Sequence, residues 1–282
     1  MRNGKFGRLM AIAAIGFATM GGASIANAGP TTLIYINDAN GKLYSYDSAA
    51  GYAETVVAAS TTLSNWGGAR SISSGPLGNT LYFQHGNGKF STYDLGTHAQ
   101  TSVGGFVPGN ALGEGRDGYL YAGAEKQLSR VDPGTGVSTL IGSGIYDFAG
   151  DIAVDPTSLG TMFGAVTTSA GVSLVSIDRS TGAQSLIGSF GLGVGDEVWG
   201  LGFSLDGTLF AAGPTGSTGG IFTINKTTGA ATSVKSLSYQ PYDMATQPFE
   251  ENEPNPMPEP ASLVLVGVAL AGMGLARRRR ID

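Results

Sequence analysis

The sequence predicts an all-β protein that folds as a β-propeller, with five blades of four antiparallel strands each. The first observation behind this prediction is a repeated hairpin pattern: a short alternating strand, an Asx residue, a Gly and a second strand. The five copies place their Asx residue at Asp47, Asp94, Asp132, Asp178 and Asn225. These residues lie 38 to 47 positions apart, and such a period built from strands alone is typical of a propeller rather than of a helical solenoid.

Two further strands precede the hairpins and complete units of four. An apolar strand rich in aromatic and β-branched residues comes directly before each hairpin. It is expected at residues 32–36, 80–84, 119–123, 161–166 and 208–213. A strand rich in small residues comes before that one, at residues 69–73, 111–115, 151–155 and 200–204. Small residues suit the innermost strand, because the sheets of a propeller converge on the axis.

The first hairpin has no inner strand in front of it. Residues 243–248, after the fifth hairpin, match residues 151–156 in pattern. We therefore expect the C-terminal strand to complete the first blade and close the ring, which removes exposed sheet edges. The alternatives are a sixth, irregular blade, for which the chain offers no segment, and an open two-sheet sandwich, whose strands would not repeat so regularly.

The charge and the cysteine content of the chain limit its expected partners and the way in which an exported form is stabilised. Between residues 29 and 247, nine Lys and Arg stand against sixteen Asp and Glu, a net charge of −7. Nucleic acid is therefore not an expected partner, because its binding depends on a basic face that neutralises phosphates. The 282-residue chain has no cysteine, so an exported form would be held by packing and sheet hydrogen bonds rather than by disulfides.

The N-terminus has the three parts of a signal peptide. Arg2, Lys5 and Arg8 are positive, residues 9–20 are apolar, and residues 26–28 read Ala-Asn-Ala, a small-residue cleavage site. We therefore expect a signal peptide at residues 1–28. The propeller domain then covers residues 29–247, a length that suits one large all-β domain.

The chain changes character after the propeller. Residues 248–260 form an acidic, Pro-rich stretch that favours an extended, solvated linker. Residues 261–276 are apolar and uncharged, and four arginines follow them. This apolar run is slightly short for a helix that spans a bilayer, but the arginines can snorkel and would be held on the cytoplasmic side.

The order of these features resembles the PEP-CTERM sorting signal. The resemblance is carried by Pro258, Glu259, Pro260, Arg277, Arg278, Arg279 and Arg280. It implies that residues 261–282 are a C-terminal sorting helix, that an exosortase-type processing protease is a partner, and that the source is a Gram-negative bacterium that makes exopolysaccharide. It further implies a precursor anchored transiently in the inner membrane and then a protein of the cell surface or extracellular matrix. An ordinary C-terminal membrane anchor is the alternative.

A ligand of the propeller is expected at the mouth of the central channel, where the inner strands begin. The candidate ligand-binding residues there are Trp66, Asn110, Asp147, Asp151, Glu197, Trp199, Tyr242 and Asp243. Aromatic faces beside carboxylates and amides suit a sugar ring, which has an apolar face and a hydroxyl rim. In the alternative interpretation, Trp66 and Trp199 only cover the mouth, and the acids are solvated or cap turns.

Catalytic and metal-binding patterns are weak in this chain. The histidines His85 and His98 lie in no metal-ligand spacing and beside no nucleophile, and we expect the first in the loop next to residues 86–88 and the second in a hairpin turn. No Gly-x-Ser-x-Gly elbow precedes a helix. We therefore predict no catalytic residue, no metal site and no cofactor. An oxygen-rich Ca²⁺ site remains as an alternative, formed by Asp151, Asp155, Asp196 and Glu197.

These observations favour a non-enzymatic binding or scaffold module of the cell envelope or extracellular matrix, linked to exopolysaccharide and biofilm. The alternative is a glycosidase or lyase that acts on polysaccharide with acids at the channel mouth, which requires two carboxylates about 5 Å or roughly 6.5–9.5 Å apart. A third possibility is a structural component without a specific ligand.

Overall fold

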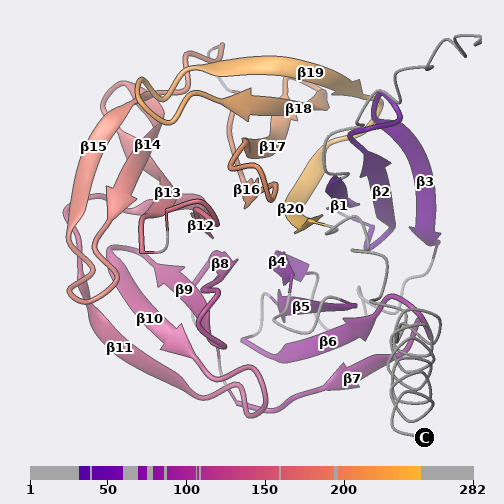
Figure 1. The fold of residues 1–282 in the computed structure, drawn as a ribbon, viewed down its shortest axis with the longest axis horizontal. Helices are drawn as coiled ribbons and strands as arrows, with labels where there is room; N and C mark the ends of the chain where they lie inside the picture. The colour runs from indigo at the N-terminus through magenta and orange to yellow at the C-terminus, as the bar shows by residue number, and fades with distance from the viewer. Residues whose placement is uncertain are drawn as a thin grey trace, which may run out of the picture.

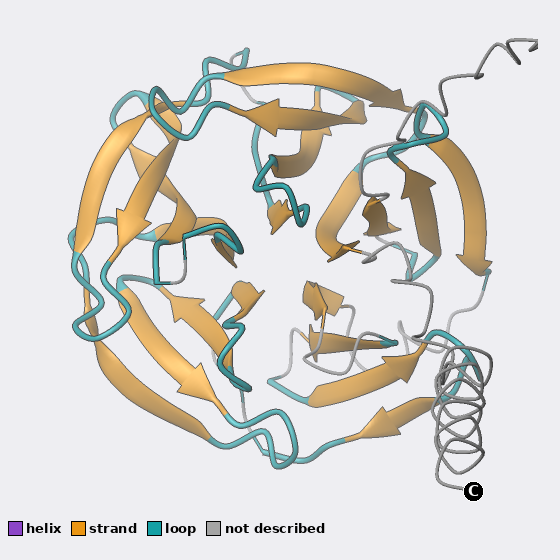
Figure 2. Cartoon of the chain, viewed as in Figure 1, coloured by secondary structure: helices purple, strands orange, loops and turns teal. Residues whose placement is uncertain are grey.

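The computed structural model describes residues 32–248, except for residues 39, 60–68, 75–78, 86–87, 106, 108, 159 and 194–195. Within these residues, all regular secondary structure is β-strand (Figure 2). The predicted signal peptide, linker and sorting helix lie outside the described residues. None of the described residues belongs to a helix that could span a membrane.

Five four-stranded antiparallel sheets stand around a central axis (Figure 1). Blade 1 consists, from the axis outward, of β20 (Pro241–Pro248), β1 (Thr32–Asp38), β2 (Leu43–Asp47) and β3 (Ala53–Ala58). Blade 2 consists of β4 (Ala69–Ser74), β5 (Thr80–His85), β6 (Phe90–Asp94) and β7 (Gln100–Ser102). Blade 3 consists of β8 (Ala111–Glu114), β9 (Leu120–Ala124), β10 (Gln127–Val131) and β11 (Ser138–Ser143).

Blade 4 consists of β12 (Phe148–Val154), β13 (Met162–Thr168), β14 (Gly171–Ile177) and β15 (Gln184–Ser189). Blade 5 consists of β16 (Gly200–Phe203), β17 (Leu209–Thr215), β18 (Thr218–Ile224) and β19 (Ala231–Leu237). The predicted five-bladed propeller is thus confirmed. The predicted closure is confirmed as well, because the C-terminal strand β20 pairs with β1 from Thr32 opposite Pro248 to Asp38 opposite Pro241.

Two inner strands begin earlier than the pattern predicts. The structure starts β12 at Phe148 and β20 at Pro241, whereas the sequence pattern points to Asp151 and Asp243. Each of these strands has a register shift in its first residues. A β-bulge adds a residue and breaks the alternation of side chains, so the first part of a bulged strand does not show the period of two on which the prediction depends.

The core consists of apolar clusters between neighbouring blades. For example, Ile34 and Met244 of blade 1 pack with Phe210 and Ile221 of blade 5, all four almost fully buried. Similar clusters join blades 1 and 2, 2 and 3, 3 and 4, and 4 and 5. Each blade therefore buries both faces of its sheet, and closure of the ring is needed to cover blades 1 and 5.

All five predicted Asx turns are present between the third and fourth strands of the blades. In the third turn, for example, Asp132 Oδ1 accepts hydrogen bonds from the backbone N–H groups of Gly134 and Thr135, both at 2.9 Å. Equivalent bonds are made by Asp47, Asp94, Asp178 and Asn225. His98 lies in the second turn, as expected, and has a φ of 61° at the position where the other turns have Gly.

The ring has two unlike faces. We call the face where the inner strands begin the mouth face, and the face where they end, together with the five Asx turns, the rear face. Because β20 runs from the mouth face to the rear face, Pro248 lies on the rear face, and so does Thr32 opposite it. Both ends of the described chain are therefore on the rear face.

Candidate ligand site at the channel mouth

The main feature of the mouth face is the ten-residue loop 190–199 between β15 and β16. Its start is fixed by Phe190, whose buried backbone donates to Val172 O at 3.2 Å and accepts from Ala231 N at 2.9 Å. Its middle is fixed by Asp196, whose carboxylate accepts from Gly193 N at 3.2 Å and from Gly216 N at 2.9 Å. The loop is thus attached to both blade 4 and blade 5.

The end of this loop lies directly on strand β17. Glu197 N donates to Pro214 O at 3.2 Å, and Trp199 N donates to Ala212 O at 2.9 Å. Gly213 between them has to be glycine, because a Cβ there would lie 1.9 Å from Glu197 O. This close backbone contact sets the positions of the Glu197 and Trp199 side chains.

Glu197, Trp199 and Tyr242 form a connected group at the mouth. The indole Nε1 of Trp199 donates a hydrogen bond to Glu197 Oε2. The Trp199 ring also meets the Tyr242 ring edge to face, with centroids 5.5 Å apart and an interplanar angle of 68°. Tyr242 is 36% exposed and Glu197 is exposed, so the group presents aromatic surface and a carboxylate to solvent.

Two cavities lie next to this group. The larger, of about 630 Å³, lies over blade 4 and is bounded by Thr167, Val172, Ser189, Asp196 and Glu197 among others. The smaller, of about 170 Å³, is lined by Asn110, Ala149, Trp199 and Tyr242. Both are lined by Asn110 and Ala149, so they adjoin at this point. The structure therefore brings Asn110, Glu197, Trp199 and Tyr242, four of the predicted site residues, to one hollow of the mouth face.

Asp151 and Asp243 lie one step deeper, beneath the mouth. Asp151 has no exposed surface and Asp243 has 1%. The carboxylate Oδ1 of Asp151 accepts from Leu112 N of blade 3 at 2.6 Å, and its backbone N–H donates to Trp199 O at 2.8 Å. Burial, and next the neighbouring Asp243, raise the pKa of Asp151 well above its ordinary value. Neither acid lines the two cavities, and Asp151 joins the inner strands of blades 3 and 4.

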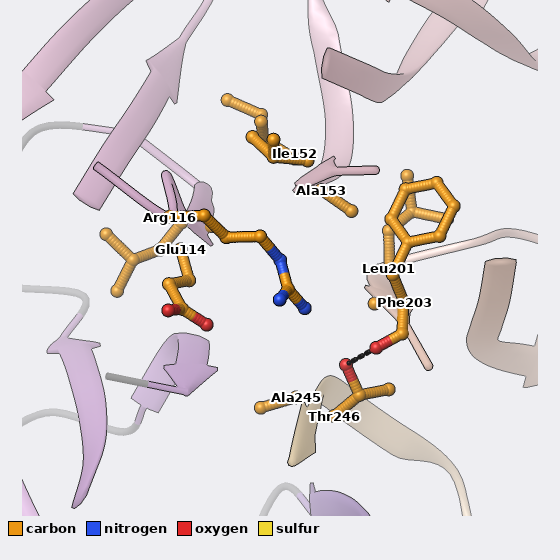
Figure 3. A pocket seen from close by; sticks show the side chains of 12 residues that line it. Glu114, Arg116, Ile152, Ala153, Leu201, Phe203, Ala245 and Thr246 are labelled. Atoms are coloured by element: carbon orange, nitrogen blue, oxygen red, sulfur yellow. Dashed lines mark hydrogen bonds between the residues drawn. The ribbon is translucent and has the colours of Figure 1, made fainter. Parts of the chain in front are cut away.

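A much smaller cavity, of about 30 Å³, lies between the inner strands of blades 1, 3, 4 and 5. Figure 3 shows the Arg116 side chain extending toward its centre. Thr246 Oγ1 closes one side by donating to Phe203 O at 2.9 Å. Such a volume holds ordered water rather than a sugar ring.

The remaining predicted residues lie elsewhere. Asp147 is exposed, precedes β12 and does not line either cavity. Trp66 lies outside the described residues. The residues of the possible Ca²⁺ site are dispersed, because Asp155 pairs with Lys226 Nζ at 2.6 Å while Asp196 holds the 190–199 loop. Among the described residues, no group of three or more His, Asp or Glu could hold a metal ion.

The expected loop position of His85 is wrong. His85 ends strand β5, has 1% of its surface exposed, and its Nε2 lies 2.8 Å from Ser91 Oγ on the neighbouring strand. The glycines that follow it suggested an earlier start of the turn. The hydroxyl partner across the hairpin explains how a polar imidazole is accommodated inside the sheet.

The larger cavity was not predicted. Its wall includes Thr167, Ala170 and Val172 from the β13–β14 hairpin, Ser189 from the end of β15, and Leu192 from the long loop. The signal that could have indicated it is the length of the connection between blades 4 and 5. Long connections in compact domains often carry binding sites.

Comparison with known proteins gives one match to a protein family and several to solved structures. Residues 258–280 match the PEP-CTERM protein-sorting motif. No curated protein matches the chain. The chain is similar to TolB from Acinetobacter baumannii at 14% identity and a TM-score of 0.44, covering 74% of this chain and 53% of that one, about half its length. It is also similar to a putative TolB from Agrobacterium tumefaciens at 10% identity and a TM-score of 0.46, covering 78% and 99%.

The sorting motif confirms the resemblance seen in the sequence. It indicates an exported bacterial protein with a membrane-anchored C-terminal signal that is a substrate for exosortase processing. Together with the five closed blades, it defines the architecture of the chain. This protein is a five-bladed β-propeller that carries a PEP-CTERM protein-sorting motif at residues 258–280.

Proposed function

We propose that the propeller is a non-catalytic binding module that takes a segment of polysaccharide into the two cavities of its mouth face. The sorting signal delivers it to the cell surface or extracellular matrix, where the ligand is exopolysaccharide of the biofilm. The observation that supports this proposal most strongly is the pair of adjoining cavities beside the Trp199–Tyr242 aromatic pair.

The dimensions and the chemistry of the hollow suit a sugar chain. The larger cavity, about 630 Å³, falls in the range of roughly 300–1,000 Å³ that is usual for small-molecule sites. The smaller cavity has an aromatic wall against which the apolar face of a sugar ring can pack. Asn110 and Glu197 supply hydrogen-bond acceptors for hydroxyl groups. Two adjoining spaces can hold successive units of one chain.

The alternative function, a glycosidase or lyase, has less support. Of the two acids at the cavities, Asp196 already accepts from two backbone N–H groups. Glu197 is then the only exposed carboxylate among the described lining residues, whereas cleavage of a glycosidic bond needs two. Asp151 has the raised pKa that a general acid requires, but it is buried and lines neither cavity. A carboxylic acid without access to the substrate cannot protonate a glycosidic oxygen.

The test is binding of the purified full chain, in detergent micelles, to the producing cell's own exopolysaccharide, with sugar release assayed in the same samples. Trp199→Ala should weaken saturable binding about tenfold, because an aromatic platform contributes on the order of 1–2 kcal/mol. The control is Tyr119→Ala, which removes an aromatic ring that lies under Arg130 on the rear face. Released oligosaccharide would instead favour the enzyme, and equal loss in both variants would remove the mouth face as the site.

A further inference from the structure

We propose that the polysaccharide bound at this site carries free amino groups, and that Glu197 is the residue that binds the ammonium group of one sugar unit. This inference rests on the proposed function and adds the chemical class of the ligand. It is carried by three features of the cavities: the sign of their charged side chains, the aromatic surface beside Glu197, and the orientation of the Asn110 amide.

The charged side chains known to line the larger cavity are both acidic. They are Asp196 and Glu197, and no Lys, Arg or His is among the described residues of the lining. The two loop positions outside the description, 194 and 195, are Val and Gly and carry no charge. A cavity lined by one sign of charge concentrates ligands of the opposite sign and repels those of the same sign. It therefore favours a cationic sugar over a uronic acid.

Glu197 is placed to receive the ammonium group. Its side chain is exposed, and the contact with the Trp199 indole uses its Oε2 atom. The carboxylate thus has further acceptor capacity, since an ionised carboxylate accepts about four hydrogen bonds. Hydrogen bonds between an ammonium donor and a carboxylate are roughly twice as strong as those between neutral groups.

The aromatic pair adds to this preference. The Trp199 indole contacts the Glu197 carboxylate, and the Trp199 ring meets the partly exposed Tyr242 ring edge to face. The negative faces of Trp and Tyr rings attract cations within about 6 Å. A carboxylate in contact with one ring of an aromatic pair is a suitable environment for an ammonium group on a sugar, because the sugar ring packs on the aromatic surface while its amine faces the charge.

Asn110 presents an acceptor at the point where the cavities adjoin. Its Nδ2 donates to Phe148 O at 3.3 Å, which orients the amide. The side-chain oxygen then remains to accept from the ligand, and amines donate more hydrogen bonds than the acetamide or carboxylate groups that can replace them. Among the described residues, no basic side chain lines either cavity.

The experiment compares three hexasaccharides by calorimetry on the full chain in detergent micelles: glucosamine, N-acetylglucosamine and glucuronic acid. The glucosamine form should bind at least tenfold more tightly than the acetylated form, and the glucuronic acid form most weakly. Glu197→Gln keeps an acceptor for the Trp199 indole but removes the charge, so it should reduce affinity for the glucosamine form to about that of the acetylated form. The matched control is Glu125→Gln, an exposed change on the turn between β9 and β10 of the same face.

The outcomes separate this inference from the proposed function. Equal binding of the amino and acetylated forms, an unchanged affinity of Glu197→Gln, or preference for the uronic acid would overturn the inference while leaving a polysaccharide-binding module. Absence of binding to all three hexasaccharides would overturn the inference, and the proposed function would then be decided by the exopolysaccharide assay above. Loss of affinity in Glu125→Gln equal to that in Glu197→Gln would show a general charge effect and would also contradict the inference.

Discussion

Gly229 and Gly51 occupy the same position in two different Asx turns. Their surroundings show two different reasons why glycine is needed at this position. Both have positive φ, 81° and 64°. A Cβ at position 229 would lie 2.4 Å from Gly188 O of blade 4, whereas a Cβ at position 51 would meet nothing within 4 Å. The first glycine therefore permits close approach of two blades, and the second only satisfies the turn conformation.

These two glycines give a matched pair of substitutions. Gly51→Ala should cost about 1 kcal/mol of unfolding free energy, the strain of an L-residue in the left-handed region. Gly229→Ala should cost more than about 2 kcal/mol, because it adds a backbone clash between blades 4 and 5. Urea unfolding of both variants measures the difference, and equal losses would mean that the interblade contact can relax without cost.

Asp151 gives a pH-dependent prediction at the same scale. Its pKa in the folded protein is raised above the ordinary 3.8 by burial and by Asp243. A group whose pKa is higher in the folded than in the unfolded protein stabilises the fold fully at pH values below its unfolded pKa. This stabilisation is lost as the pH rises through its folded pKa. Asp151→Asn does not titrate and keeps an acceptor for Leu112 N. The melting temperature of the variant minus that of the original protein should therefore increase from pH 4 to pH 8. A difference that does not change with pH would contradict the burial of an ionisable Asp151.

At the scale of the elements, the rear-face loops of neighbouring blades are joined by ion pairs. Arg179 in the Asx turn of blade 4 contacts Asp117 of blade 3 at 2.6 Å, and Lys226 in the turn of blade 5 contacts Asp155 of blade 4 at 2.6 Å. In both cases the basic residue directly follows the Asx residue. The turn thus fixes its own hairpin and also holds the preceding blade.

The Lys226–Asp155 pair should contribute to stability against acid. Burial by itself would raise the pKa of Asp155, but Lys226 and the Thr157 hydroxyl outweigh it and lower the pKa. A group whose pKa is lower in the folded than in the unfolded protein stabilises the fold at pH values above its unfolded pKa. This stabilisation is lost as the pH falls through its folded pKa. Asp155→Asn should therefore cost about 1–2 kcal/mol at pH 7, since Lys226 is partly solvated, and the cost should shrink at pH 3. Chemical denaturation at both pH values measures this loss of unfolding free energy. A loss that does not change with pH would exclude the ion pair as its cause.

Strands in which apolar and polar residues alternate strictly could be predicted from the sequence. Bulged strand ends and the path of the long loop could not. The hairpin at Asp132 and the closing strand at Asp243 follow local patterns, and the structure confirms both. The early starts of β12 and β20 follow from bulges that break the pattern. The larger cavity depends on the path of loop 190–199, which is set by contacts such as Gly213 with Glu197 O and by no local periodicity. Asn110, Trp199 and Tyr242 could be placed at the mouth because they precede inner strands.

At the scale of the whole molecule, closure of the ring and attachment of the sorting signal involve the same strand. β20 supplies Met244 and Ala245 to the clusters between blades 5 and 1 and between blades 1 and 2. It also ends on the rear face, ten residues before the sorting motif begins at position 258. Ten extended residues reach at most about 35 Å. The cavities therefore open on the face opposite the strand end that leads to the sorting signal.

Truncation tests the role of the closing strand. A chain that ends at residue 240 lacks β20 and should lose its cooperative unfolding transition, because the apolar residues of β1 such as Ile34 and Ile36 lose their cover. A chain that ends at residue 248 retains β20 and should keep the transition. Cooperative unfolding of the shorter chain, followed by circular dichroism during heating, would mean that four blades and an open edge are sufficient.

The proposed function requires a polysaccharide in the hollow between Glu197 and Tyr242 on the mouth face. A crystal structure of the protein with a bound hexasaccharide is the direct test. We predict sugar density in the two adjoining cavities, with one ring packed against Trp199 or Tyr242 and a polar group within hydrogen-bonding distance of Glu197. A sugar bound on the rear face or on the outer strands, with the cavities holding only water, would contradict the account.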